Sequence, residues 1–369
     1  MCHHPGRPAP LLERPGPHIP PRTHPSAHRG RPCRPPAPLR PADRCHRGPD
    51  SRLARTQDQD IDDSEQPSLM VDDDKDGPVA SVYKNDNAQR EVRSWCAQRI
   101  ADWGIPHVRS EVVTSAGVTG VVTTGPEPRD GEPGVVLLPG TNMNAALCLP
   151  LVEELARARR VVILDLPGQP GLSVGRRPHV RRMAWYGNWL SEALTQAVPG
   201  PAVVVGHSLG GAVALASDAP RIVGRVVLAG AGITRLRVPV PLLAATAPWL
   251  LRPSADRSAA LLRRLAAPGR AELPGHLTAW MHLVARHCRT SLAPPPLPSS
   301  LLERRRTVPT LVVAGRFDPF LPPRTLGPAA RRRLGAEFRV IEGAGHLLLD
   351  EAPVEVSAVV EEFCAGVGG

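Results

Sequence analysis

A serine stands at the joint between two apolar segments. In the stretch PAVVVGHSLGGAVAL, residues 201–215, a strand-like run leads into Gly-His-Ser-Leu-Gly-Gly and a helix-like run follows. The sharp turn of a Gly-x-Ser-x-Gly motif strains the serine backbone, and Gly206 and Gly210 provide the room that it needs. Such a turn holds Ser208 Oγ clear of the sheet, beside free N–H groups that stabilise an oxyanion. We therefore interpret Ser208 as a nucleophile.

A serine hydroxyl is a weak nucleophile unless a base takes its proton and a third group orients that base. Both groups follow later apolar runs. Asp318 comes just after TLVVAG, and His346 follows FRVIEGAG in a glycine-flanked loop. Because the carboxyl ends of parallel strands meet at one edge of a sheet, we expect Ser208, Asp318 and His346 to converge there.

Other polar residues lack this setting. His207 is adjacent to the serine and cannot point in the same direction, so we interpret it as a packing histidine. The histidines of a long insertion follow no strand, which favours a surface or lid role: His276, His282 and His287. The run Arg331 to Arg333 is typical of a solvated helix face.

The segments that must position these residues alternate between strand and helix patterns. An amphipathic helix over residues 87–104 precedes a hairpin in SEVVTSAGVTGVVTTGPE. Short, wholly apolar strands follow in GVVLLPG and RRVVILD, further strands are predicted in RVVLAG, TLVVAG and FRVIEG, and the helix APVEVSAVVEEFC closes the chain. Strands that are apolar throughout are covered by helices on both faces. The sequence therefore predicts an α/β fold with a mostly parallel central sheet flanked by helices.

The spacing between strands predicts the domain organisation. It fits single β-α crossovers everywhere except between Gly230 and Thr310. We therefore predict a core formed by residues 79–232 and 301–369, interrupted by a helical lid over residues 233–300.

The lid sequence is richer in apolar residues than a short connection needs. With Trp249, Trp280 and Met281 in it, the lid favours an apolar acyl or alkyl group as the small-molecule substrate, rather than a sugar or a nucleotide. Packing within the lid explains part of the same pattern.

Residues 1–78 differ from the rest in composition. The first 50 residues contain 14 prolines, and residues 1–55 carry 11 arginines against 3 acidic residues. We predict a disordered tail, with Met70 as an alternative start of the protein. Since residues 1–55 hold +8 of the formal net charge of +10, the remaining 314 residues hold only +2, and the total charge does not indicate nucleic-acid binding by the folded part.

Cysteine use and hydropathy suggest a compartment. The 7 cysteines are scattered along the chain, so we expect free thiols. The three cysteines of the tail show no metal-ligand spacing, so we expect no metal site there: Cys2, Cys33 and Cys45. No run of 18 apolar residues and no signal-peptide core is found, which predicts a cytoplasmic protein without a membrane span.

Four motifs together resemble the α/β-hydrolase family, over roughly residues 111–369: GHSLGG, LDLPGQPGLS, AGRFDPF and GAGHLLLDE. The resemblance, which is to the esterase-like branch with a serine nucleophile, implies Ser208 as nucleophile, Asp318 as triad acid and His346 as base. The chemistry that this resemblance implies requires no cofactor and no metal. In the family pattern Asp-x-Pro-Gly, Asp165 is a loop-bracing residue.

One loop departs from the family pattern. Many members have His-Gly after the third family strand, whereas this chain has Pro-Gly-Thr-Asn at residues 139–142. The resemblance implies that the backbone N–H groups of Leu209 and Thr141 form the oxyanion hole, with Asn142 as a rival to Thr141.

These features predict a serine hydrolase that acts on an acyl ester through an acyl-enzyme. The same fold and triad also serve thioesterases, lactonases, carbon–carbon bond hydrolases and cofactor-free perhydrolases, and a catalytically silent ligand-binding member is a further alternative. The serine argues against the haloalkane dehalogenase and epoxide hydrolase branches, which use an aspartate nucleophile.

Overall fold

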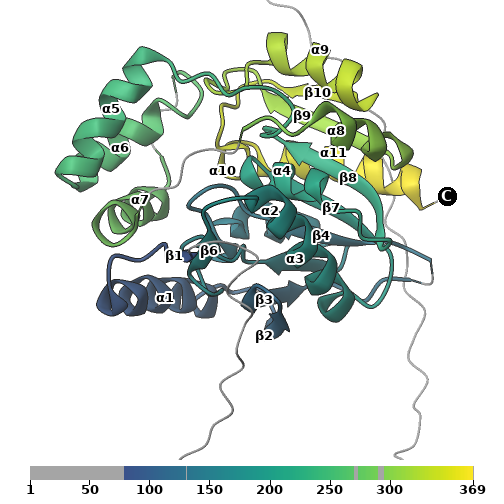
Figure 1. Ribbon diagram of the computed structural model, residues 1–369, viewed down its shortest axis with the longest axis horizontal. Coiled ribbons are helices and arrows are strands. Elements are labelled where there is room, and N and C mark those ends of the chain that lie inside the picture. Colours follow the sequence, from purple (N-terminus) through teal and green to yellow (C-terminus); the bar gives the residue numbers. More distant parts are fainter. Residues whose placement is uncertain (1–78, 130, 270–272, 290–294, 369) are drawn as a thin grey trace, which may run out of the picture. The chain divides into compact units, whose positions relative to one another are not determined.

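The computed structural model describes residues 79–129, 131–269, 273–289 and 295–368, so the predicted tail lies outside the described residues. Its main sheet has the strands β2 (His107–Thr114), β3 (Gly117–Thr124), β4 (Gly134–Leu138), β5 (Val161–Leu164), β7 (Ala202–His207), β8 (Ile222–Leu228), β9 (Thr310–Gly315) and β10 (Glu337–Ile341). Their spatial order is β10-β9-β8-β7-β4-β5-β3-β2 (Figure 1).

The sheet is mostly parallel, as predicted. The strands β4, β5, β7, β8, β9 and β10 pair in parallel, and β2 and β3 form an antiparallel hairpin at one edge. β3 joins this hairpin to β5 by antiparallel pairing. The sequence thus predicted both the parallel centre and the hairpin.

Alternate residues of the central strands enter different cores. Val203 and Val205 of β7 belong to one buried cluster, whereas Val204 between them belongs to another on the opposite face. This alternation follows from the two-residue period of a strand. Both faces are therefore covered, which is why these strands are apolar throughout.

Helices supply the covering layers. The helices α3 (Arg182–Ala197), α4 (Leu209–Ala216), α8 (Ser299–Arg304) and α9 (Pro323–Leu334) contribute to the clusters on one face. The helices α1 (Asp86–Ala101), α2 (Leu149–Leu155), α10 (Leu348–Glu351) and α11 (Pro353–Val367) contribute to the cluster on the other. Short 3-10 turns occur at Ala145–Leu147 and Arg305–Thr307.

Three helices fill the predicted insertion: α5 (Val240–Leu251), α6 (Ala255–Arg263) and α7 (Gly275–His287). They form a separate group beside the sheet in Figure 1, which we call the cap. Buried cap residues such as Leu242, Leu261 and Trp280 join the core cluster of α1 and α2. Among the described residues, no helix is long and apolar enough to cross a bilayer.

The residues just before α1 are hydrogen-bonded to the end of the last cap helix, α7. The strand β1 (Val79–Ser81) pairs with β6 (Arg176–Pro178), and the next residues run beside the chain that leaves α7. Lys84 N–H donates to His287 O at 2.9 Å, and Arg289 N–H donates to Val82 O at 2.7 Å. These two hydrogen bonds join parts of the chain that are about 200 residues apart. No local sequence pattern predicts them.

The prediction of a solvated helix face at residues 331–333 is wrong for the last residue of the run, Arg333. Arg333 donates to the backbone oxygens of Ile233 and Leu297, which lie just before and just after the cap. Arg331 and Arg332 are exposed. Arg333 differs because the helical repeat turns it toward the two segments that connect the cap to the core.

Candidate active site

The turn at Ser208 has the strained geometry that the motif predicts. Ser208 has φ 49° and ψ −109° between the end of β7 and the start of α4. A Cβ atom on Gly206 would lie 2.4 Å from the backbone of Gly210, and one on Gly210 would lie 2.2 Å from Leu138 O. Side chains at either position would collide with backbone, so only glycine permits this close approach.

His346 and Asp318 form a buried pair. The distance between His346 Nδ1 and Asp318 Oδ2 is 2.9 Å, and the Asp318 side chain is fully buried. Its other oxygen accepts the N–H groups of Phe320 and Leu321 at 2.8 and 3.0 Å. Burial acts to raise the pKa of Asp318, but the His346 charge and these hydrogen bonds lower it below its ordinary value. The carboxyl is thus held in its charged form beside the imidazole.

One cavity of about 360 Å³ brings the predicted residues together. Ser208, His346, Gly140, Thr141 and Asn142 all line it. Among the described residues, no hydrogen-bond partner lies within reach of Ser208 Oγ. The hydroxyl and the imidazole therefore share a cavity in which a substrate would lie between apolar walls and polar groups.

The cap and the neighbouring loops supply the apolar walls. Each helix of the cap contributes side chains to the cavity, including Leu242, Trp249, Leu262, Leu277 and Met281. Among the described residues that line the cavity, the side chains that could act as a nucleophile, an acid or a base are those of Ser208, His207 and His346. The cavity therefore suits an uncharged, apolar group.

A tight turn shapes the loop opposite Ser208. Met143 N–H donates to Gly140 O at 3.1 Å, and Asn142 has φ 56°. Asn142 N–H is already donated to Gln169 Oε1 at 2.9 Å. By contrast, no acceptor for the N–H of Thr141 or Leu209 is found in the part of the chain that the structure describes. Of the two rivals in the loop, Thr141 is thus the one with an N–H available.

The sequence did not predict that the cap would contact this loop. Trp280 Nε1 on α7 donates to Asn142 O at 2.6 Å, and the indole is fully buried. Its ring packs on Trp95 of α1, with the ring centroids 4.9 Å apart. From the sequence, Trp280 is expected only to be an apolar lid residue, and no motif indicates that its N–H reaches the loop.

Asp165 holds its own loop through backbone hydrogen bonds, as the family pattern suggested, and it also holds a second loop. It accepts the N–H of Leu172 in its own loop at 2.8 Å and that of Ala145 in the loop after β4 at 2.6 Å. Burial raises its pKa to about 6, against the lowering effect of these two hydrogen bonds. Asp165 is not among the residues that line the cavity of Ser208.

His207 is buried, as predicted, but it does more than fill space. Its Nε2 lies 2.9 Å from His346 O, and the two rings are 5.2 Å apart. Burial and the nearby His346 lower its pKa to about 4, so the ring is neutral at physiological pH. A neutral ring can donate through Nε2 to the backbone of the His346 loop, which fixes that loop against β7.

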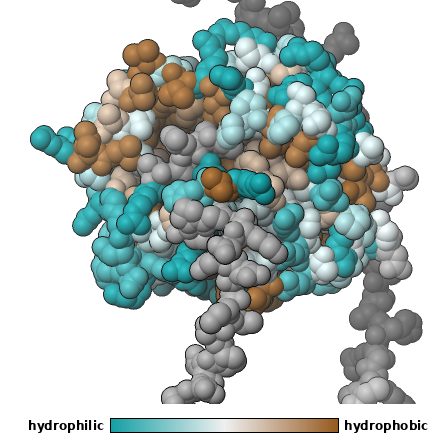
Figure 2. All heavy atoms as spheres, viewed as in Figure 1, coloured by the Kyte–Doolittle hydropathy of each residue, from teal (hydrophilic) through white to brown (hydrophobic). Residues whose placement is uncertain are grey.

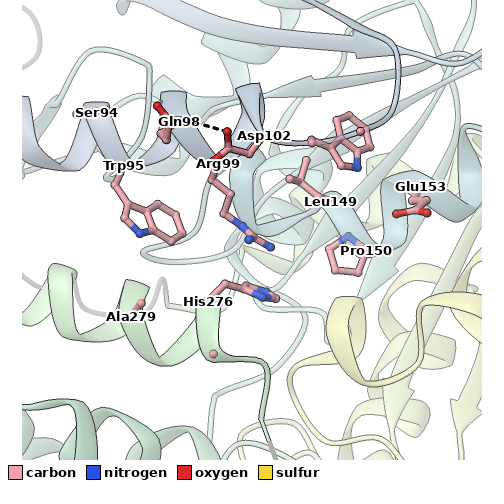
Figure 3. Close-up of a pocket in the computed structure, with 13 residues that line it drawn as sticks. Ser94, Trp95, Gln98, Arg99, Asp102, Leu149, Pro150, Glu153, His276 and Ala279 are labelled. Atoms are coloured by element: carbon pink, nitrogen blue, oxygen red, sulfur yellow. Dashed lines mark hydrogen bonds between the residues drawn. The ribbon is translucent and has the colours of Figure 1, made fainter.

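His276 and His287 of the cap lie at the seam between cap and core. His276 Nε2 is 3.0 Å from Asp350 Oδ1, and His287 Nε2 is 3.1 Å from Glu91 Oε2. His276 also borders a groove of about 750 Å³ between α1, α2 and α7, where its ring and the Arg99 side chain extend into the same space (Figure 3). Neither Ser208 nor His346 is among the residues that line this groove. The groove is therefore separate from the smaller, apolar cavity of Ser208.

The described residues contain no group of three or more His, Cys, Asp or Glu side chains that could hold a metal ion. The four cysteines in this part of the chain are free and buried: Cys96, Cys148, Cys288 and Cys364.

Residues 135–359 match the model of the family described as Alpha/beta hydrolase family. Lipase LipV of Mycobacterium tuberculosis (strain ATCC 25618 / H37Rv) is 31% identical over 210 residues, which cover 48% of this chain and 77% of the lipase. Epoxide hydrolase A of the same strain is 33% identical over 141 residues, 32% of this chain, and the match spans only 43% of that protein.

Solved structures resemble the described fold. Carboxylesterase CesB from Bacillus subtilis has a TM-score of 0.62 at 18% identity, and the match covers 76% of this chain and 99% of that one. The naproxen esterase of the same organism has a TM-score of 0.61 at 20% identity, with 76% and 98% covered. At such low identity, the likeness establishes the fold alone.

Proposed function

The chain belongs to the alpha/beta hydrolase family, and from this premise we propose that it is a serine hydrolase that cleaves carboxylic esters with an apolar acyl or alkyl group. The observation that carries the proposal is the buried His346–Asp318 pair, at 2.9 Å, in the same cavity as the strained Ser208. A serine hydrolase with a triad uses a nucleophile, a base that takes its proton and an acid that orients the base. The esterase and lipase names of the similar proteins are in keeping with it.

In the proposed first half-reaction, Ser208 Oγ attacks the ester carbonyl carbon while His346 Nε2 takes the hydroxyl proton. Asp318 holds the Nδ1 proton of His346 and stabilises the imidazolium that forms. The carbonyl oxygen becomes an oxyanion, for which the N–H groups of Thr141 and Leu209 are the donors. The intermediate then expels the alcohol, which receives its proton from His346, and leaves an acyl-enzyme.

In the second half-reaction a water molecule gives its proton to His346 and attacks the acyl carbon. Ser208 departs and recovers the proton, and the carboxylic acid is released. Every proton is exchanged between Ser208, His346, water and substrate, so the proposed cycle calls for no cofactor and no metal.

The cavity lining supports an ester rather than a charged substrate. The lining is apolar on the cap side, and fully burying an unpaired charge in it would be costly. Thioesters and lactones with apolar chains would fit the same description, as would substrates of a carbon–carbon bond hydrolase or a perhydrolase. A serine in the nucleophile position disfavours the chemistry of the epoxide hydrolase branch, despite the partial match to Epoxide hydrolase A.

The test is a hydrolysis screen of p-nitrophenyl esters of increasing acyl length, together with thioesters and lactones, on the full chain. We expect ester cleavage that improves as the acyl chain lengthens to the reach of the cavity. A fluorophosphonate probe should label the wild-type protein at Ser208 and should not label Ser208→Ala. If neither labelling nor cleavage of any acyl substrate were found, the ligand-binding alternative would replace this proposal.

A further inference from the structure

The outer face of the cap helix α5 is apolar and exposed. The helix sequence VPLLAATAPWLL has no charged residue. Only Leu242 and Trp249 are buried, whereas the exposed fractions are 77% for Val240, 59% for Leu243 and 81% for Leu251. A helix that is apolar all round is normally buried. In Figure 2 hydrophobic surface gathers over the corner where Figure 1 places α5.

Arginines frame this face at both ends of α5. Arg235 and Arg237 precede the helix and Arg252 and Arg257 follow it, and all four are exposed. Within the described residues, the side chains of Arg235, Arg237 and Arg252 make no hydrogen bond or ion pair. Residues 233–289 hold nine arginines and two acidic residues, of which Asp256 lies beside the patch. The cap is thus the strongly basic part of the folded chain.

The apolar face continues into the cavity of Ser208. Val238 and Leu250 are 55% and 37% exposed, and both also line that cavity. The same side chains thus belong to the outer surface and to the cavity wall. The outer apolar face is therefore continuous with the wall of the Ser208 cavity at these two residues.

We propose that the α5 face, with its four flanking arginines, docks on the surface of an anionic lipid bilayer. The exposed leucines and valines enter the headgroup region while the arginines contact lipid phosphates. α5 has 12 residues, too few to span a bilayer, so it lies along the interface. Resting on the proposed function, the docked protein takes its ester substrate from the lipid phase through the Val238–Leu250 rim.

The charges favour a lipid surface over a second copy of the chain. Two copies paired through α5 would bring their arginine groups together, and like charges across an interface oppose association. An anionic bilayer supplies the complementary charge and the apolar layer at once. This combination matches the two properties of the patch.

The first experiment measures binding by co-sedimentation of the full chain with vesicles. One set contains phosphatidylcholine alone and the other contains equal parts of phosphatidylcholine and phosphatidylglycerol. We expect binding to the anionic set, weakened by added salt, because exposed charges are screened. Replacing Arg235 and Arg252 by Gln should lower the partition coefficient roughly tenfold or more, and the double change Leu243→Ser, Leu251→Ser should lower it to a similar extent.

Val113→Ser is the matched control. Val113 lies on β2, away from the cap, and is 67% exposed. Its replacement removes an exposed apolar side chain and should leave vesicle binding unchanged. None of the substituted residues lines the cavity of Ser208, so hydrolysis of a water-soluble short-chain ester should be retained in all variants and reports that they are folded.

Vesicle binding is measured without substrate, so it stands apart from the proposed activity. Hydrolysis without vesicle binding would overturn the docking proposal and leave the proposed function intact. Vesicle binding without hydrolysis of any ester would overturn the proposed function and leave the docking proposal intact. Equal binding to both vesicle sets, or an equal loss in Val113→Ser, would also overturn it. So would a dimer in light scattering that dissociates in the Leu243→Ser, Leu251→Ser variant, because it would assign the face to self-association.

Discussion

The indole N–H of Trp280 donates to the backbone oxygen of Asn142 at 2.6 Å, which joins the cap to the loop opposite Ser208. The neighbouring Thr141 offers the N–H that we assign to the oxyanion. Asn142 is held from its other side by Gln169 Oε1, whose amide contacts Tyr186. The loop is therefore fixed between the core and the cap, and Trp280 is a positioning residue for the proposed reaction.

Trp280→Phe retains a large ring against Trp95 but removes the N–H. We expect kcat for a short-chain ester to fall about tenfold, as for a weakened oxyanion contact, while KM changes little. The reason is that Asn142 O loses its donor and the adjacent Thr141 N–H is no longer held in place. Steady-state kinetics measure the effect.

Trp249→Phe is the control for this substitution. Its indole N–H donates to Met281 O at 3.2 Å, within the cap, so the same chemical change leaves the loop untouched. Because the Trp249 ring also lines the cavity, we expect some effect on KM, but a smaller loss of kcat than in Trp280→Phe. An equal loss of kcat in both variants would mean that Trp280 acts through cap packing alone.

Ser208→Ala should abolish ester hydrolysis and leave the fold intact. The side chain is small and makes no hydrogen bond to the described residues, so its removal costs little packing. Loss of a triad member typically lowers the rate by several powers of ten, on the order of 10⁴ or more. Kinetics and thermal melting on the same sample check this. Residual turnover near that of the wild type would exclude Ser208 as the nucleophile.

Asp318→Asn should lower turnover by roughly 10⁴, because the amide cannot hold the His346 tautomer that accepts the serine proton. Asp165→Asn should instead lower stability by about 2 kcal/mol, since an amide can no longer accept both backbone N–H groups. Paired kinetics and melting separate the two. A loss of turnover without a loss of stability in Asp165→Asn would refute the assignment of Asp318 as the acid.

The raised pKa of Asp165 predicts a pH dependence of stability. Burial raises this pKa from 3.8 to about 6, so between these values the folded protein keeps a proton that the unfolded chain releases. The contribution of Asp165 to stability is thus full below the unfolded pKa and is lost as pH rises through about 6. The stability advantage of the wild type over Asp165→Asn should therefore be larger at pH 4 than at pH 7, by about 2 kcal/mol.

Asp318 provides a comparison of opposite sign. Its pKa is lowered in the folded state, so its contribution is present above the unfolded pKa and is lost as pH falls through the folded value. In melting curves extended below pH 4, Asp318→Asn should flatten the acid side, because the folded pKa of Asp318 lies below 3.8. If the wild type and Asp165→Asn keep a constant difference at all pH values, Asp165 does not titrate as described.

The sequence by itself determined the features that depend on near neighbours. The turn at Ser208 follows from two glycines within two residues of the serine, because their missing side chains remove clashes at 2.4 and 2.2 Å. The parallel centre of the sheet follows from strands that are apolar on both faces. The placement of Asp318 and His346 after predicted strands was likewise visible, whereas their roles and the cytoplasmic location remain predictions.

Only the tertiary structure decided which distant groups meet. Trp280 and Asn142 are 138 residues apart, and His207 and the oxygen of His346 are 139 apart. Arg333 looked like a member of a solvated run until the fold brought Ile233 and Leu297 within reach of its guanidinium. Periodicity reports which face of an element is apolar. A hydrogen bond between elements depends on how those elements pack in three dimensions, and no local pattern carries that information.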